Sequence, residues 1–263
     1  MIVLLFALML GPSDAPPNRS NADEIIQKSV QAINHDWEAA PQFECSERDR
    51  DRSGTKTYED LMIAGSPYQK LVLINGKPLE PARAADEKKK LEQAISGRQG
   101  ESDQQRAQRM AKYEADQKRN HLMMEQMTKA FDFKLAGETR LEGHEVYVLK
   151  ATPHKGYRPP NMQAQALTGM EGKLWIDESS FQWVRVEAEV IHPVSIEGFL
   201  AKVERGTHFE VEKGPVASDV WLPKHFSMRS HAKVLFLIPH DGEEDDTWFN
   251  CHKTAPVQKA AGQ

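Results

Sequence analysis

GETRLEGHEVYVLKATP (137–153) and, after a loop, GKLWIDESSFQWVRVEAEVI (172–191) decide the fold. In the second segment four aliphatic side chains recur at every other position: Val184, Val186, Ala188 and Val190. The opposite face carries Trp183, Arg185, Glu187 and Glu189. A helix would not keep four aliphatic residues at a strict period of two, so the pattern predicts a strand. One apolar and one charged face are typical of an antiparallel sheet that is buried on one side.

Turn-forming residues divide this stretch into consecutive strands. The residues Asp-Glu-Ser-Ser at 177–180 lie between two β-rich runs and predict a hairpin turn. Glycine and proline bound a further strand over 145–151, in which Val146 and Val148 lie on one face and Leu149 on the other. We therefore expect three or four antiparallel strands here, in the middle of one large, curved sheet.

The rest of the chain adds one helix and more strands. Apolar residues at helical spacing predict a helix over 24–38, capped by Asn21 or Asp23: Ile25, Ile26, Val30, Ile33 and Trp37. Three strands over 43–75 then form a meander, and strands resume after the insertion, with a hairpin turn expected at 240–244. The fold class is therefore mainly β (α+β), with about ten strands in one sheet.

Residues 77–128 interrupt this pattern with a segment dense in Lys, Glu, Arg, Gln and Ala. Its sparse apolar positions and the break at 97–100 predict two helices, inserted between strands as an arm or lid. Its charged run is typical of a solvated helical face. The Met-rich end, which contains Met124 and Met127, is consistent both with a mobile cover over the sheet and with ordinary core packing, because methionine suits either.

The N-terminal run MIVLLFALML is followed by small residues and proline, as in an export signal, although no Lys or Arg precedes it. The alternative is a buried N-terminal strand or helix. We expect a signal peptide or disordered leader over 1–20, one domain over 21–253 and a loose tail over 254–263. No later apolar run approaches the ~20 residues that a membrane span needs, so we expect no transmembrane span in the mature chain.

The two cysteines, Cys45 and Cys251, lie near opposite ends of the chain. In an exported protein such a pair can form a disulfide, which would tie the two ends of the sheet together. Two separate buried thiols are the alternative, since geometry decides between them.

No residue pattern predicts a reaction, a metal site or a cofactor. His225 and His231 share a strand face with Arg229, but a zinc site needs three or four converging ligands, and pairing with glutamates on neighbouring strands accounts for these residues. The acidic run 241–246 lacks the spaced oxygen ligands of a calcium loop, and we expect it to be a solvated turn. There is no GxSxG nucleophile elbow. A net charge of −5 without a basic aromatic patch argues against nucleic-acid binding.

A sheet of about ten strands tends to curl rather than stay flat. A curled sheet with an apolar inner face and helices across its mouth could hold an acyl chain, because ligand pockets are mostly apolar. The alternative is that the helices simply fill the concavity as core.

The helix, the strand meander, the two quoted segments and VWLPKHFSM (220–228) together resemble the periplasmic lipoprotein-carrier superfamily typified by LolA and LolB, whose fold the RseB-type stress-sensor domain shares. The resemblance covers roughly residues 23–253, apart from the insertion. It implies an unclosed antiparallel half-barrel with helices across its concave side. It also implies an apolar cavity for acyl chains and a location in a bacterial periplasm.

These observations predict a non-catalytic protein, periplasmic or otherwise exported, that binds a lipid or an acylated protein, as in outer-membrane lipoprotein sorting. The expected lining residues come from apolar strand faces and from the insertion: Leu73, Met124, Met127, Val148, Ile176, Val186, Phe226 and Met228. The alternative is an envelope interaction or sensor module, in which the concavity is filled and the insertion and the outer sheet face bind a protein partner. An envelope hydrolase would need a convergent His/Asp/Ser cluster.

Overall fold

The computed structural model describes residues 19–196, 201–234 and 238–254; the rest of the expected leader and tail lies outside these ranges. The helices are α1 (Arg19–Ala39), α2 (Pro81–Gln99), α3 (Asp103–Ala130) and α4 (Met162–Gln165), with 3-10 turns η1 (Ala40–Gln42) and η2 (Ala166–Gly169). The strands are β1 (Phe43–Asp51), β2 (Gly54–Ile63), β3 (Ser66–Ile74), β4 (Lys77–Pro78), β5 (Phe131–Leu141), β6 (His144–Pro153), β7 (Met170–Asp177), β8 (Trp183–Val190), β9 (Val194–Ile196), β10 (Ala201–Val203), β11 (His208–Pro215), β12 (Trp221–Val234) and β13 (Ile238–Lys253).

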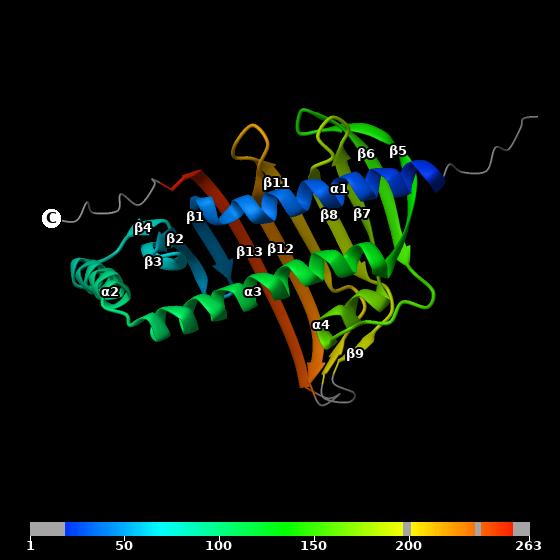
Figure 1. Ribbon diagram of the computed structural model, residues 1–263. Coiled ribbons are helices and arrows are strands. Elements are labelled where there is room, and N and C mark those ends of the chain that lie inside the picture. Colours follow the sequence, from blue (N-terminus) through cyan, green and yellow to red (C-terminus); the bar gives the residue numbers. More distant parts are fainter. Residues whose placement is uncertain (1–18, 197–200, 235–237, 255–263) are drawn as a thin grey trace, which may run out of the picture.

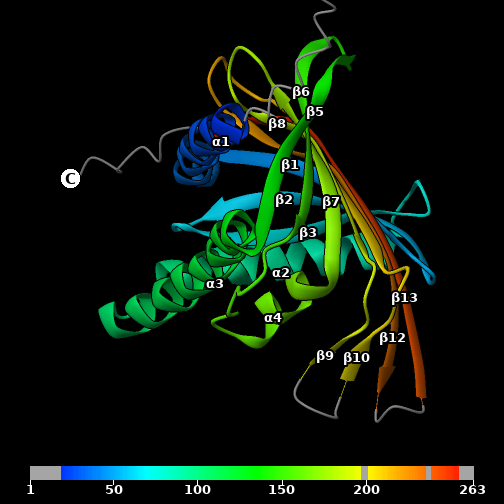
Figure 2. The ribbon, with the colours of Figure 1, turned by 90° about the vertical axis from the view of Figure 1, so that its right-hand side faces the viewer.

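The described strands form one antiparallel sheet in the order β4-β3-β2-β1-β13-β12-β11-β8-β7-β6-β5, with β10 and β9 beside β12. The two ends of this order do not pair, so the sheet is unclosed. Helices α1 and α3 lie across one face of the sheet, which we term the concave face (Figures 1 and 2). The mainly β class, the open antiparallel sheet, the N-terminal helix and the helical insertion predicted from the sequence are all confirmed.

Three features of the secondary structure differ from the expected ones: the start of α1, the number of strands and one turn. Helix α1 already includes Asn21 and Asp23, so neither residue is its N-cap. The sheet has two short strands that the sequence did not predict, β4 and β9, and the strand expected over 199–212 is divided into β10 and β11. The turn expected at 240–244 is wrong, because these residues belong to β13 and pair in register with β12.

Strand β8 contains an irregularity that reverses part of its predicted face. Ile176 of β7 pairs with Trp183, whereas the preceding residue, Trp175, pairs with Arg185, so one residue of β8 is left over. Trp183 consequently lies in the core on the concave side, while Val184 packs on the other face with Val146. The expectation that Val184 shares a face with Val186, and Trp183 with Arg185, is therefore wrong.

The core on the concave side is formed by side chains of α1 and of the strands beneath it. Ala22, Ile25, Ile26 and Ile33 of α1 are buried in one cluster with β6, β7 and β8 side chains. The recurrence of these residues at helical spacing gives α1 the apolar stripe predicted from the sequence. Burying each isoleucine contributes roughly 1.5–3 kcal/mol, which holds the helix on the sheet.

A buried ion pair fixes the end of α1. The carboxylate of Asp36 accepts hydrogen bonds from Lys213 Nζ at 2.5 Å, from Gln182 Nε2 at 3.0 Å and from the backbone N–H of Trp221 at 2.9 Å. Asp36 and Lys213 are 3% and 7% exposed. One carboxylate thus connects α1 to β11, to the residue before β8 and to the start of β12.

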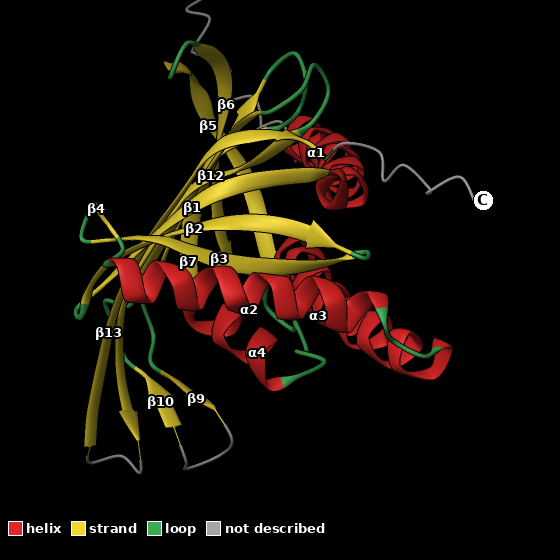
Figure 3. Cartoon of the chain, turned by 90° about the vertical axis from the view of Figure 1, so that its left-hand side faces the viewer, coloured by secondary structure: helices red, strands yellow, loops and turns green. Residues whose placement is uncertain are grey.

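The helical insertion packs along β2 and β3 (Figure 3). Helix α3 begins with a capping box, in which Ser102 and Gln105 each bond the other's backbone N–H. Arg98 Nη1 donates to the carbonyl oxygens of Ile63 and Ser66 at 2.9 and 2.8 Å, so α2 holds the β2–β3 turn. None of the helices in the described ranges is long and apolar enough to cross a membrane.

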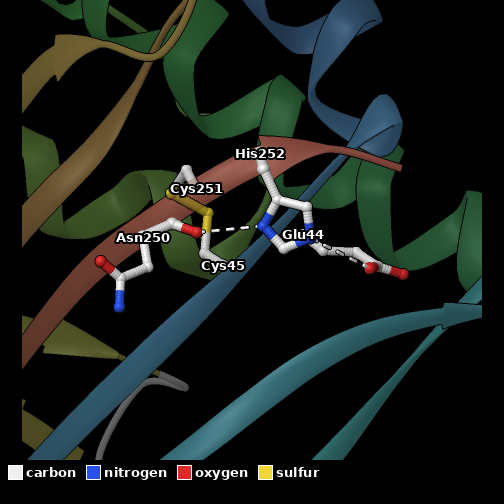
Figure 4. The surroundings of a disulfide bond; sticks show 5 residues. All are labelled: Glu44, Cys45, Asn250, Cys251 and His252. Carbon is white, nitrogen blue, oxygen red and sulfur yellow. Dashed lines mark hydrogen bonds and ion pairs between the residues drawn. A yellow bond between two sulfur atoms is a disulfide. The ribbon is translucent and has the colours of Figure 1, made fainter. Parts of the chain in front are cut away.

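The structure contains a disulfide between Cys45 of β1 and Cys251 of β13, so it has the first of the two arrangements left open by the sequence (Figure 4). The two strands pair side by side, with a register shift between Glu44 and Ser46. His252 lies 3.8 Å from Glu44 next to this bond (Figure 4). The bond joins residues 206 positions apart and ties the first strand of the chain to the last.

Candidate functional site

One half of the concave face is filled by side chains. Large residues from α3, β5, β8 and β11 meet over β7 there, and we term this region the covered half: Met127, Phe131, Phe133, Leu174, Trp183, Val186 and Phe209. The space left between them is about 20 Å³. Because one water molecule needs about 10–15 Å³ on this measure and ligand pockets hold roughly 300–1,000 Å³, this half has no room for an acyl chain.

The other half of the concave face is open. A groove of about 860 Å³, termed the open groove, runs between η1, the strands β1–β3, the ends of β12 and β13, and helix α3. Its apolar lining includes Phe43, Leu61, Met62, Tyr113, Leu222 and Trp248. Helix α1 ends at Ala39, before β1, so its apolar stripe does not reach these strands. The groove is open because nothing equivalent to α1 covers it.

A smaller hollow of about 350 Å³, termed the acidic pocket, adjoins the open groove. It is lined mainly by carboxylates, together with Tyr58 and Gln69: Glu47, Asp49, Asp51, Glu243, Glu244 and Asp246. Asp49 pairs with Asp246, and Asp51 with Glu244, across β1 and β13. Since alternate residues of a strand share a face, β1 presents three acids to the same side. Glu47 and Gln69 belong to both hollows.

Burial and mutual repulsion raise the pKa of two carboxyl groups in this cluster. Burial, followed by repulsion from the nearby carboxylates of Asp60 and Asp246, raises the pKa of Glu47 to about 7. Burial likewise raises the pKa of Asp246 to about 7, with Glu244 and Asp49 as the next causes. Asp246 is 7% exposed, and its Oδ1 atom has no hydrogen-bond partner. Lys56 pairs with Asp49 and Arg229 with Glu243, so the six carboxylates that line the pocket are only partly compensated when they are ionised.

The opposite, outer face of the sheet is neutralised by ion pairs. Glu210, Glu212 and His225 approach one another closely enough to hold a cation. The guanidinium of Arg185 lies among these acids, 3.4 Å from Glu210 and in contact with Glu212, so its positive charge already fills this role.

The face of β12 that carries the two histidines pairs with acids of β13, of which two are aspartates and one is a glutamate. His225, Arg229 and His231 pair with Asp245, Glu243 and Asp241, at 3.6, 3.7 and 3.2 Å. These acids come from the run that the sequence placed in a turn. Glu244 and Asp246, which alternate with these acids along β13, line the acidic pocket together with Glu243.

A His–Asp–Ser grouping occurs at the β7–β8 turn, but its bonding differs from that of a hydrolase. His144 Nδ1 lies 3.0 Å from Asp177. The hydroxyls of Ser179 and Ser180 donate to this same carboxylate at 2.6 and 2.8 Å, rather than to the imidazole. Neither serine is thus bonded to the histidine, as a Ser-His nucleophile would require. The grouping stabilises the turn.

Six of the eight predicted lining residues lie on the concave side. Met124, Met127, Ile176 and Val186 belong to the cluster of the covered half. Phe226 and Met228 lie on β12 opposite Val211 and Phe209, which pack against the same cluster. The structure thus places four of these six on strands of the concave face and the other two on α3.

Val148 and Leu73 lie elsewhere. Val148 pairs with Trp175, whereas its neighbour Leu149 is in the core under α1, so Val148 faces away from the helices. Leu73 is half-buried in β3, pairs with Thr57 and lines neither hollow. Sequence reasoning missed the open groove and the acidic pocket. Acids at every other position of 47–51 were the sequence signal for one wall of the pocket.

No family model and no curated protein matches this chain. Among solved structures it is similar to a domain named for outer membrane lipoprotein sorting from Vibrio parahaemolyticus, at 10% identity and a TM-score of 0.35 over 92% of this chain and 96% of that one. It is also similar to a LolA superfamily protein from Nitrosomonas europaea, at 10% identity and a TM-score of 0.33 over 92% and 97%. MucB of Pseudomonas aeruginosa, solved with MucA, gives 10% identity and a TM-score of 0.22 over 87% and 99%. These solved structures fall in the superfamily that the sequence resembles, and at such distance they carry no function over to this chain.

Proposed function

We propose that this chain is a non-catalytic protein of a bacterial envelope that binds a lipid or a lipidated ligand on its concave face. The observation that supports the proposal is the open groove, whose volume of about 860 Å³ lies within the range of ligand pockets. Its aromatic and aliphatic lining would remove an acyl chain from water at about 0.8 kcal/mol for each buried CH₂.

In this proposal the acyl chain of the ligand enters through the open groove rather than through the covered half. The covered half leaves only about 20 Å³, and Met124 and Met127 of α3 close it. Methionine side chains repack easily, so displacement of the end of α3 would expose Ile176 and Val186 to a longer ligand. In this proposal the residues of the covered half are secondary contacts.

The proposal is tested by purifying the protein without detergent and measuring its mass under native conditions, followed by extraction with organic solvent. A co-purifying lipid, or uptake of an added fluorescent fatty acid, at about one per chain would support a binding site of this size.

A charged substitution in the groove then locates the site. We expect Met62→Glu to weaken fatty-acid binding at least about tenfold, because a carboxylate at the groove lining opposes burial of the chain. Ile95→Glu is the matched control, since Ile95 is 36% exposed on α2 and lies outside the groove lining. Equal binding by both variants and the unmodified protein would remove the groove from the proposal.

The filled state of the covered half favours a second candidate, an interaction or sensor module of the envelope. In that case α2, whose described side chains are mostly exposed and include a run of charged residues, would contact a protein partner. A mass without lipid, combined with no uptake of fatty acid or acylated peptide, would select this candidate.

A further inference from the structure

We propose that the ligand of the concave face is an acylated polypeptide segment with lysine or arginine side chains next to its acyl chain, the chain lying in the open groove and the basic side chains in the acidic pocket. This inference rests on the proposed function and adds the chemical class of the ligand.

The two hollows are placed for such a ligand. They share Glu47 and Gln69, so an occupant can extend from one into the other. The groove supplies apolar surface, and the pocket supplies carboxylates at the end of that surface.

The spacing of the acids favours a polypeptide over a single charged head group. Glu47, Asp49 and Asp51 follow at every second position of β1, so they extend over roughly 13 Å at about 3.3 Å per residue. Glu244 and Asp246 of β13 face two of these residues. A row of this length matches several cationic side chains along one extended segment, whereas one ammonium group would meet only part of it.

The charged groups around the pocket leave it negative. From β2 it is faced by Asp60 and by Lys56, which pairs with Asp49 across the strands. From β3, Gln69 donates a hydrogen bond to Glu47. Arg48 and Arg50 alternate with the pocket acids on β1 and line a separate hollow with Asp245. Asp246, more than nine-tenths buried, keeps its Oδ1 atom without a partner.

A bare metal ion does not fit the pocket as well. In the described part of the chain, the acids whose oxygen atoms lie close enough together to share an ion are Glu210 and Glu212, with His225, on the outer face. The carboxylates of the acidic pocket surround about 350 Å³, which is far larger than one cation requires.

The test compares labelled peptides that differ only in charge or acylation, at pH 8 and low salt. One peptide carries an N-terminal palmitoyl chain followed by lysines at alternate positions, the second has glutamates in their place, and the third has the lysines without the acyl chain. Dodecylammonium serves as an amphiphile with a single charge. Fluorescence anisotropy, with dodecylammonium as a competitor, gives the affinities.

We expect the acylated lysine peptide to bind at least about tenfold more tightly than the acylated glutamate peptide, since two or three screened charge pairs contribute about this much. The double variant Glu47→Gln/Asp246→Asn should lose this preference while keeping its affinity for the acylated glutamate peptide. The control Glu138→Gln/Glu189→Gln, which removes two exposed charges outside the pocket, should keep the preference.

Other results separate the two proposals. Equal affinity for both acylated peptides would overturn the charge assignment and leave lipid binding in place. Binding of the lysine peptide irrespective of its acyl chain would overturn lipid binding and leave the acidic pocket as a peptide site. Competition by dodecylammonium as strong as that by the lysine peptide would replace the polypeptide by a lipid amine. Absence of binding by every probe would overturn both proposals.

Discussion

The carboxylate of Asp36 on α1 is bonded to three other parts of the fold. It is the buried counter-ion of Lys213. Burial lowers the pKa of Lys213, and the charge of Asp36 opposes this shift without cancelling it. Removing one member of a buried ion pair leaves an uncompensated charge, whereas replacing both by apolar residues of similar size is often nearly neutral. The network therefore specifies where α1 lies more than it adds net stability.

We accordingly expect Asp36→Ala to lower the free energy of unfolding by about 3–5 kcal/mol, because Lys213 would stay buried without a partner. The double variant Asp36→Asn/Lys213→Met should recover most of this loss, because it removes both charges while the Asn oxygen can still accept from Gln182 and from the backbone N–H of Trp221. Denaturant unfolding monitored by tryptophan fluorescence measures both. A loss below about 1 kcal/mol in the single variant would show that Lys213 reaches solvent instead.

The acidic pocket makes the protein more stable as the pH falls from 8 towards 5. In Glu47 and Asp246 the pKa is raised from 4.5 and 3.8 to about 7, so the folded state binds more protons than the unfolded state between these values. The destabilising effect of their repulsion is absent below about pH 4, where the two groups are protonated in the folded and the unfolded state alike. It is complete above about pH 7, where both groups are ionised in the folded state.

Between pH 8 and pH 5.5 the unmodified protein should therefore gain roughly 1–3 kcal/mol relative to Glu47→Gln/Asp246→Asn, after allowance for solvent screening around the partly exposed Glu47. Melting curves of both proteins at the two pH values provide the measurement. The variant also serves as the control for every other titratable group of the protein. Parallel pH dependence in the two proteins would contradict the assigned pKa values.

At the scale of elements, alternation in the sequence predicts which segments are strands, but it does not determine which way each strand faces. In β6 both faces are apolar, and the helices cover Leu149 rather than Val148. In β8 one extra residue near Val184 reverses the pattern, as the pairing of Ile176 with Trp183 shows. A period of two cannot reveal an extra residue whose side chain is itself apolar.

The acidic pocket was hidden from the sequence for a related reason. The run 241–246 has the composition of a turn, and only the pairing of β13 with β12 and β1 separates its acids by face. Asp241, Glu243 and Asp245 meet basic partners, whereas Glu244 and Asp246 meet the acids of β1. Which residue of a strand lies opposite which is long-range information, and one chain's local pattern does not contain it.

At the scale of the whole molecule, the open groove exists because two halves of the sheet are covered differently. Helix α1 fills the concave side of β5–β8, while β1–β3 receive only one end of α3 and the side of α2. In the sheet, the β1–β4 segment joins the rest solely through the pairing of β1 with β13 among the described strands. The disulfide lies across this one seam, and Cys45 lines the groove.

Breaking the disulfide should therefore loosen one half of the molecule more than the other. We expect Cys45→Ser/Cys251→Ser to lower the free energy of unfolding by about 2–5 kcal/mol, the usual effect of a cross-link that closes a long loop. Hydrogen exchange measured by mass spectrometry should rise most in β1–β3 and least in β6–β8, which α1 covers. The affinity for an acylated ligand should fall as well, since β1–β3 form the floor of the groove. Uniform acceleration of exchange across both halves would mean that the seam does not divide the sheet, and that the groove depends on the covered half for its shape.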